Sequence, residues 1–154
     1  MANVTTLAKG GTGVAALANA EFPVIIKHEV DVAEAVAAGL ATTEYVVVTN
    51  IPADTYFRLL QVEVVETVSL GGSARLDLGD SADDDEFVSN ATTYTAGTNL
   101  TLLKGDGSSG DVYTAADTLR LKVTGLGVAS ATGKIRFVWM QAPTDRKAPM
   151  TVQS

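Results

Sequence analysis

Two runs of regularly spaced apolar residues near the C-terminus constrain the fold more than any other feature of this sequence. In residues 119–124 and again in residues 134–139, every second position holds Leu, Val, Ile, Phe or Trp, and most positions between are charged or Thr. A period of two gives a β-strand one buried and one solvent-facing side. Because the glycine-bearing stretch 125–133 separates the runs, we predict a β-hairpin over residues 117–141. Trp139, the sole tryptophan, is expected to anchor the core.

Shorter apolar runs bounded by turn-forming residues predict further strands. In residues 22–30, His28 shares one face with apolar residues, whereas Ile25 and Lys27 lie on the opposite face. The other predicted strands are residues 45–51, 55–68, 74–78, 87–95 and 100–103.

The longest of these, residues 55–68, contains an irregularity. Leu60, Val62 and Val64 are predicted to face the core. The doubled valine at positions 64 and 65 breaks the alternation and predicts a bulge, or a bend where one strand serves both sheets.

One stretch, residues 31–40, has helical character. Asp31 is a candidate N-cap, Glu34 stands three residues later as in a capping box, and Gly39 marks the end. We predict one or two helical turns.

Roughly seven or eight short strands joined by turns predict an all-β fold, an antiparallel β-sandwich or jelly-roll-like domain with one short helical turn. We expect the sandwich to cover residues 22–142, preceded by a flexible, extended N-terminal arm (residues 1–21) and followed by a flexible C-terminal tail (residues 143–154). Uncovered sheet edges favour a symmetric homo-oligomer.

Composition argues against several classes of function. Cysteine is absent, which excludes disulfides, thiolate metal sites and cysteine nucleophiles. Eighteen acidic and eleven basic residues give a formal net charge of −7, which opposes binding to nucleic acid or to anionic lipid. No apolar run approaches the about 20 residues of a membrane helix. We therefore expect neither a nucleic-acid nor a membrane partner.

The candidate catalytic and metal-binding residues each have a simpler structural interpretation. His28, the single histidine, lies on an apolar strand face and is predicted to be a hydrogen-bonded core residue rather than a general base. The carboxylates of residues 79–86 could gather around calcium, but they do not match the helix-loop-helix calcium motif, so a solvated acidic turn is favoured. A glycosidase-like pair of carboxylates is a weaker interpretation. No cofactor, metal or catalytic residue is predicted.

Four basic residues of the predicted hairpin share its outward face: Arg120, Lys122, Lys134 and Arg136. They predict either a docking surface for an acidic partner or a sheet face neutralised by Glu63, Glu66 or Asp77 on a neighbouring strand, and we favour the second. The glycine segments 11–13 and 127–134 resemble phosphate-binding loops, but both depart from the required pattern.

A family resemblance extends over residues 24–141. It rests on Asp31-Val32 leading to Ala-Ala-Gly-Leu at 37–40, Ile-Pro-Ala-Asp-Thr at 51–55, Arg-Leu-Asp-Leu-Gly-Asp at 75–80, Asp-Asp-Glu-Phe-Val at 84–88, Thr-Ala-Ala-Asp-Thr-Leu-Arg-Leu at 114–121 and Ala-Thr-Gly-Lys-Ile-Arg at 131–136. In this order of turns and strands the chain resembles small β-sandwich virion proteins of tailed bacteriophages, similar to capsid decoration (cement) proteins.

The resemblance implies a non-enzymatic viral structural protein, made in the host cytoplasm and located on the capsid exterior of the virion. It further implies a homotrimer or other small oligomer whose partner is the major capsid protein. The arm is expected to order only against another surface. Its predicted capsid- or neighbour-binding residues are Val4, Leu7, Lys9, Val14, Leu17 and Phe22.

The alternative hypothesis is a tail or fibre β-sandwich module that binds a glycan on a host surface. Such a site needs exposed aromatic side chains that converge with polar groups. Tyr56, Tyr94 and Tyr113 are the candidates.

Overall fold

The computed structural model describes residues 3–4, 23–40, 45–92, 94–103, 110–125 and 131–144. In chain order its elements are β1 (Asn3–Val4), β2 (Val24–Asp31), α2 (Val32–Ala37), β3 (Tyr45–Ile51), β4 (Thr55–Ser69), β5 (Arg75–Gly79), β6 (Val88–Ala91), β7 (Asp111–Tyr113), β8 (Asp117–Thr124) and β9 (Thr132–Pro143).

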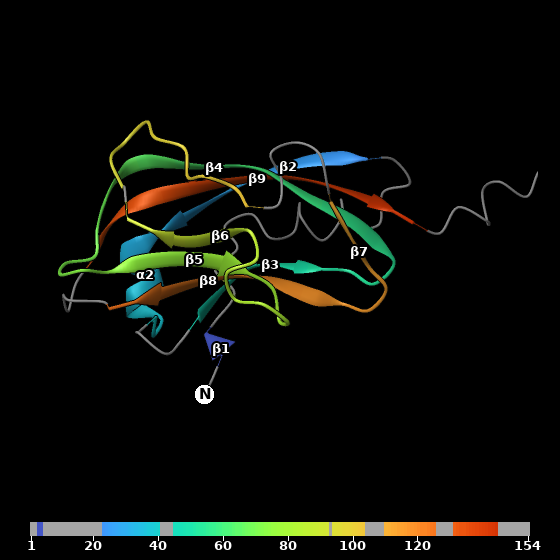
Figure 1. Cartoon of the computed structure of the whole chain (residues 1–154), viewed down its shortest axis with the longest axis horizontal. Helices are drawn as coiled ribbons and strands as arrows, with labels where there is room; N and C mark the ends of the chain where they lie inside the picture. The colour runs from blue at the N-terminus through green and yellow to red at the C-terminus, as the bar shows by residue number, and fades with distance from the viewer. Residues whose placement is uncertain are drawn as a thin grey trace, which may run out of the picture.

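The strands form two sheets that lie one above the other (Figure 1). One sheet has the order β1-β3-β8-β5-β6 and the other β2-β9-β4-β7. All strand pairs are antiparallel except β1 with β3, which is parallel. The predicted all-β antiparallel sandwich with one short helix is therefore confirmed for the described residues. β9 ends at Pro143, and the predicted tail beyond residue 144 lies outside them.

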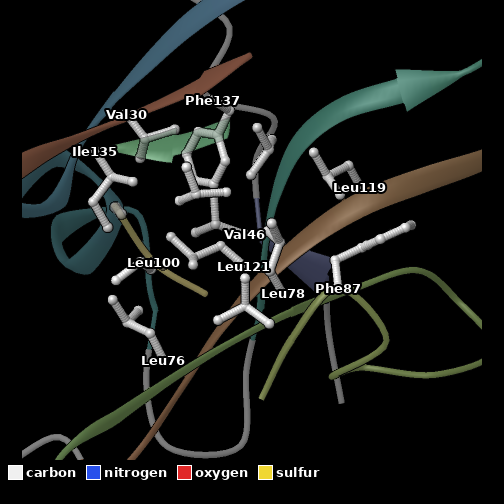
Figure 2. Packing of buried hydrophobic residues seen from close by; sticks show 14 of the residues in the cluster. Val30, Val46, Leu76, Leu78, Phe87, Leu100, Leu119, Leu121, Ile135 and Phe137 are labelled. Atoms are coloured by element: carbon white, nitrogen blue, oxygen red, sulfur yellow. The ribbon is translucent and has the colours of Figure 1, made fainter. Parts of the chain in front are cut away.

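The predicted hairpin over residues 117–141 is wrong. β8 pairs with β3 and β5 in one sheet, whereas β9 pairs with β2 and β4 in the other. Alternation identifies the buried face of a strand but not its partner, and the stretch of nine positions between the runs is longer than the 2–5 residues of a usual hairpin loop. Both strands face the same interior from opposite layers, with Leu119 and Leu121 on one side and Ile135 and Phe137 on the other (Figure 2).

An aromatic cluster occupies the core between the sheets. The ring of Phe57 lies 6.0 Å from that of Phe87, 6.1 Å from that of Tyr113 and 6.2 Å from that of Trp139. Trp139 is fully buried, and its indole N–H donates to Gln141 Oε1 at 3.1 Å. Full burial of such a side chain stabilises the fold by several kcal/mol, by analogy with the about 1.5–3 kcal/mol of smaller apolar residues. The predicted anchoring role of Trp139 is confirmed.

β4 contains more irregularities than its sequence indicates. The predicted bulge is present as a register shift between Val64 and Glu66. A second shift, between Leu59 and Gln61, turns Leu59 to the core and leaves Leu60 partly exposed, so the predicted inward position of Leu60 is wrong. β4 stays in a single sheet.

The short helix begins and ends where its sequence signals predict. The Asp31 carboxylate accepts hydrogen bonds from the backbone N–H groups of Ala33 (2.9 Å) and Glu34 (3.3 Å). These bonds satisfy two N–H groups that lack intrahelical partners. Gly39 follows with a φ of 110°, a backbone conformation that L side chains rarely adopt.

Two short segments differ from the prediction. Residues 100–103 do not form a strand; Asn99 makes an isolated bridge with Glu63, and the Leu100 N–H donates to the Val62 carbonyl at 2.8 Å. β7 was not predicted, because three residues are too few to show a period.

Candidate functional site

The first candidate surface is the sheet edge at β3, where the two residues of β1 pair with the sandwich. Asn3 pairs with Tyr45 and Val4 with Val46, in parallel orientation. Val4 is therefore the one predicted contact residue whose backbone the structure describes. The others, Leu7, Lys9, Val14, Leu17 and Phe22, lie outside the described residues, and the contact role of all six stays a prediction.

His28 lies in β2 opposite Phe137 of β9 and is only 4% exposed. The predicted core position is confirmed. Burial in this apolar surrounding keeps the imidazole away from solvent and from any substrate that would approach the outer surface.

The acidic loop that follows β5 contains a buried carboxylate. Asp80 is only 6% exposed, and its Oδ1 accepts hydrogen bonds from the backbone N–H groups of Ala82 (2.8 Å) and Asp83 (3.1 Å). Its Oδ2 accepts the Tyr113 hydroxyl at 2.8 Å. The prediction of a solvated turn is therefore wrong for Asp80, because this residue ties the loop to β7.

Burial and hydrogen bonding act in opposite directions on this carboxyl group. Burial alone would raise the pKa of Asp80, but the hydrogen bonds, led by that from Tyr113, lower the pKa below its ordinary value. Burial, reinforced by the bond to Asp80, raises the pKa of Tyr113. The pair is thus held as carboxylate and neutral phenol.

The remaining loop carboxylates also bind groups of the protein. Asp84 forms an ion pair with Lys122 at 2.8 Å, and this bond raises the pKa of Lys122. Asp85 accepts the Ser89 hydroxyl at 2.8 Å, which lowers the pKa of Asp85. Among the described residues, no group of three or more His, Asp or Glu is placed to hold a metal ion.

The basic residues of β9 are neutralised across the sheet. Lys134 Nζ lies 2.7 Å from Glu66 Oε1. The Arg136 guanidinium bridges two strands, with contacts of 2.7 Å to Glu29 Oε2 and 3.1 Å to Glu63 Oε2. The predicted neutralised sheet face is confirmed here with Glu63 and Glu66; Glu29 was not predicted as a partner.

The basic residues of β8 lie on the other sheet and have separate contacts. The Arg120 guanidinium lies 4.4 Å from the centre of the Tyr45 ring, and its Nε donates to Thr118 Oγ1 at 2.8 Å. Lys122 lies opposite Asp77 in the strand register but pairs with Asp84. The four basic residues therefore belong to two separate surfaces.

The three candidate glycan-binding tyrosines do not converge. Tyr113 is buried and faces inward from β7, whereas Tyr56 is an outward residue of β4. The Tyr94 hydroxyl donates to the backbone carbonyl of Ala74 at 2.8 Å and also to that of Ala91. They do not form the predicted shallow aromatic site.

Neither phosphate-loop candidate receives support. Residues 11–13 and 126–130 lie outside the described part of the chain, and Lys134 lies in a strand, bound to Glu66, rather than at the start of a helix. In the residues that the structure describes, no helix is both long and apolar enough to cross a lipid bilayer.

Comparison with known proteins identifies similar folds. No protein-family model matches the sequence, and no curated protein matches it. A chain of the cyanophage Pam1 capsid asymmetric unit is 19% identical, with a TM-score of 0.55 over 77% of this chain and 82% of that one. A chain of the capsid of Ralstonia phage GP4 is 13% identical, with a TM-score of 0.57 over 82% of this chain and 88% of that one. At these identities the likeness shows the fold alone.

Proposed function

We propose that this protein is a non-enzymatic component of a phage capsid, which binds the outside of the assembled shell and stabilises it. The observation that carries the proposal is the likeness of its sandwich to chains from two phage capsid structures, over 77% and 82% of its own length. The resemblance of residues 24–141 to virion proteins in the order of turns and strands supports the same role.

The chemistry of the described residues is consistent with a structural role. Within that part of the chain, His28 lies in the core and the carboxylates Asp80, Asp84 and Asp85 bind groups of the same chain. A hydrolytic site needs a nucleophile or base that reaches a substrate from a cleft. The tail or fibre alternative receives no support from the separated tyrosines.

Many copies of a modest contact, repeated over the capsid lattice, would supply the binding energy. We propose a trimer or other small oligomer in which the arm of one subunit lies on its neighbour or on the major capsid protein. Modest contacts repeated over a symmetric lattice add up through effective concentration. The pairing of Asn3 and Val4 with the edge of β3 supports a role in which the N-terminal segment adds to a sheet edge.

The proposal is tested by mixing the purified full-length protein with undecorated capsids from the same source and sedimenting the particles. We expect saturable binding at a fixed number of copies per capsid subunit, together with an increased resistance of the shell to heat or chaotrope. No binding at micromolar concentration, or binding without a fixed stoichiometry, would contradict a decoration role.

Deletion of residues 1–21 tests the role of the arm. The circular dichroism spectrum and the cooperative unfolding transition should be retained, because among the described contacts the deletion removes only the two strand pairs of β1. Shell binding should be lost. A truncated protein that still decorates capsids at full occupancy would refute the role proposed for the arm.

A further inference from the structure

The outward face of β2, β9 and β4 changes character along its length. Toward one end, Arg136 lies between Glu29 and Glu63, and Lys134 lies opposite Glu66. Each of these carboxylates binds one of the two cations. We call this part the ion-paired end. Its charges are satisfied within the sheet, so it offers a partner few uncompensated groups.

Toward the other end the same strands present apolar side chains outward. Ile25 lies opposite Met140 in the strand register. The bulge between Leu59 and Gln61 leaves Leu60 partly exposed rather than in the core, and it lines a shallow hollow together with Ile25 and Val138. We call this the apolar end, and it comprises Ile25, Leu60, Leu102, Val138 and Met140. Ile25 is well exposed and Val138 is buried, and the other three are partly exposed.

One residue of this end, Ile25, is unusually exposed for its type. Among the described residues the large apolar side chains that are well exposed are Ile25 (62%), Leu103 (59%) and Val112 (58%). The hollow beside Ile25 has a polar border, where the side-chain amide of Gln61 donates to that of Asn99 at 2.7 Å. An exposed apolar side chain beside an apolar hollow with a polar rim is a feature of protein interaction sites.

Charge limits what can cover the patch. Lys27 lies opposite Val138, and it forms no ion pair with any residue that the structure describes. The chain as a whole has a formal net charge of −7, so two copies repel each other. If two copies met through this end, they would also bring like cations together. A partner with carboxylates around an apolar centre complements it.

Ile25 lies close in sequence to the proposed arm. The arm joins the sandwich at Pro23, and Ile25 is the second residue of β2.

We propose that the apolar end is the surface that docks on the capsid shell, against apolar side chains surrounded by carboxylates. The inference rests on the proposed function and adds to it the face that binds. Buried apolar area supplies affinity, and the cation Lys27 orients the subunit on the acidic rim.

The test compares Ile25→Asp and Lys27→Glu with wild type in the capsid sedimentation assay, at low and at high salt. Thr132→Asp is the matched control, because it adds the same charge as Ile25→Asp at an exposed position of β9 at the ion-paired end. We expect Ile25→Asp to weaken shell binding at least about tenfold. Lys27→Glu should weaken binding most at low salt, where charge pairs are least screened. Thr132→Asp should bind within about twofold of wild type, and unfolding transitions should be unchanged in all three.

The outcomes separate this inference from the proposed function. Absence of wild-type binding overturns both. Wild-type binding with equal binding by Ile25→Asp overturns the docking surface alone. If Ile25→Asp changes the mass of the free protein in analytical ultracentrifugation while each subunit still binds the shell normally, the patch joins copies of this chain and the proposal is wrong.

Discussion

The inward and outward sides of β9 obey different physical rules, although the same twelve residues provide both. Inward, Ile135, Phe137 and Trp139 are fully buried. Outward, Lys134 and Arg136 bind carboxylates of the neighbouring strands, and further along the strand Val138 and Met140 are apolar. The comparison indicates that the inward side contributes most to stability, whereas the charged residues of the outward side can change with little effect on folding.

The largest effect is expected on the inward side. Trp139→Ala should lower the free energy of unfolding by about 3–5 kcal/mol, because it removes a fully buried aromatic and leaves a cavity beside Phe57. Urea denaturation followed by circular dichroism measures the change. Met140→Ala, the outward neighbour, is the control and should cost much less. Equal losses from the two variants would contradict the division between the faces.

The buried pair of Tyr113 and Asp80, which joins β7 of one sheet to the loop after β5 of the other, should have an intermediate effect. Tyr113→Phe removes the hydroxyl that donates to Asp80, and loss of one partner of a buried charged acceptor typically costs about 1–3 kcal/mol. The same urea denaturation at neutral pH tests this. An unchanged free energy of unfolding would show that Asp80 does not depend on Tyr113.

The same variant has a defined pH dependence. The pKa of Asp80 is lower in the folded protein than its ordinary value of 3.8, so its contribution to stability is present above that value and is lost as the pH falls through the folded pKa. The difference between wild type and Tyr113→Phe should therefore be constant above about pH 5 and shrink below pH 4. A difference that grows on acidification would contradict the assignment of Asp80 as a carboxylate.

The smallest effect is expected at the ion-paired end. Glu66→Gln removes the partner of Lys134 on the solvent-exposed face, where water and salt screen the charges and ordering two long side chains offsets most of the attraction. The midpoint of urea denaturation should stay within experimental error of wild type. A clear loss of stability from Glu66→Gln in the wild-type protein, and none in a Lys134→Gln background, would show that this ion pair on the outward face contributes to folding.

Local features of the fold could be predicted from the sequence, and long-range features could not. The cap at Asp31 and the turn at Gly39 depend on residues close in the chain. Leu59 faces the core where Leu60 was expected, because of a bulge that no local sequence pattern indicates. The assignment of β8 and β9 to different sheets depends on distant partners.

The same limit applies to the candidate surfaces. Alternation placed Ile25 and Lys27 on the outward face, so an apolar residue at an outward position was a visible signal. The bond between Tyr113 and Asp80 joins residues 33 positions apart. No pattern in the sequence near either residue indicates its partner. Most of the predicted contact residues of the arm lie outside the described residues, so their role depends on experiment.

The central claim is that this protein decorates the exterior of a capsid in many copies. Quantitative mass spectrometry of purified particles from the source of this chain, with the copy number taken relative to the major capsid protein, tests it most directly. We predict a ratio near one, or near one trimer for each local threefold site. A few copies per particle would place the protein in the tail or fibre and contradict the claim, and its absence from particles would remove it from the virion.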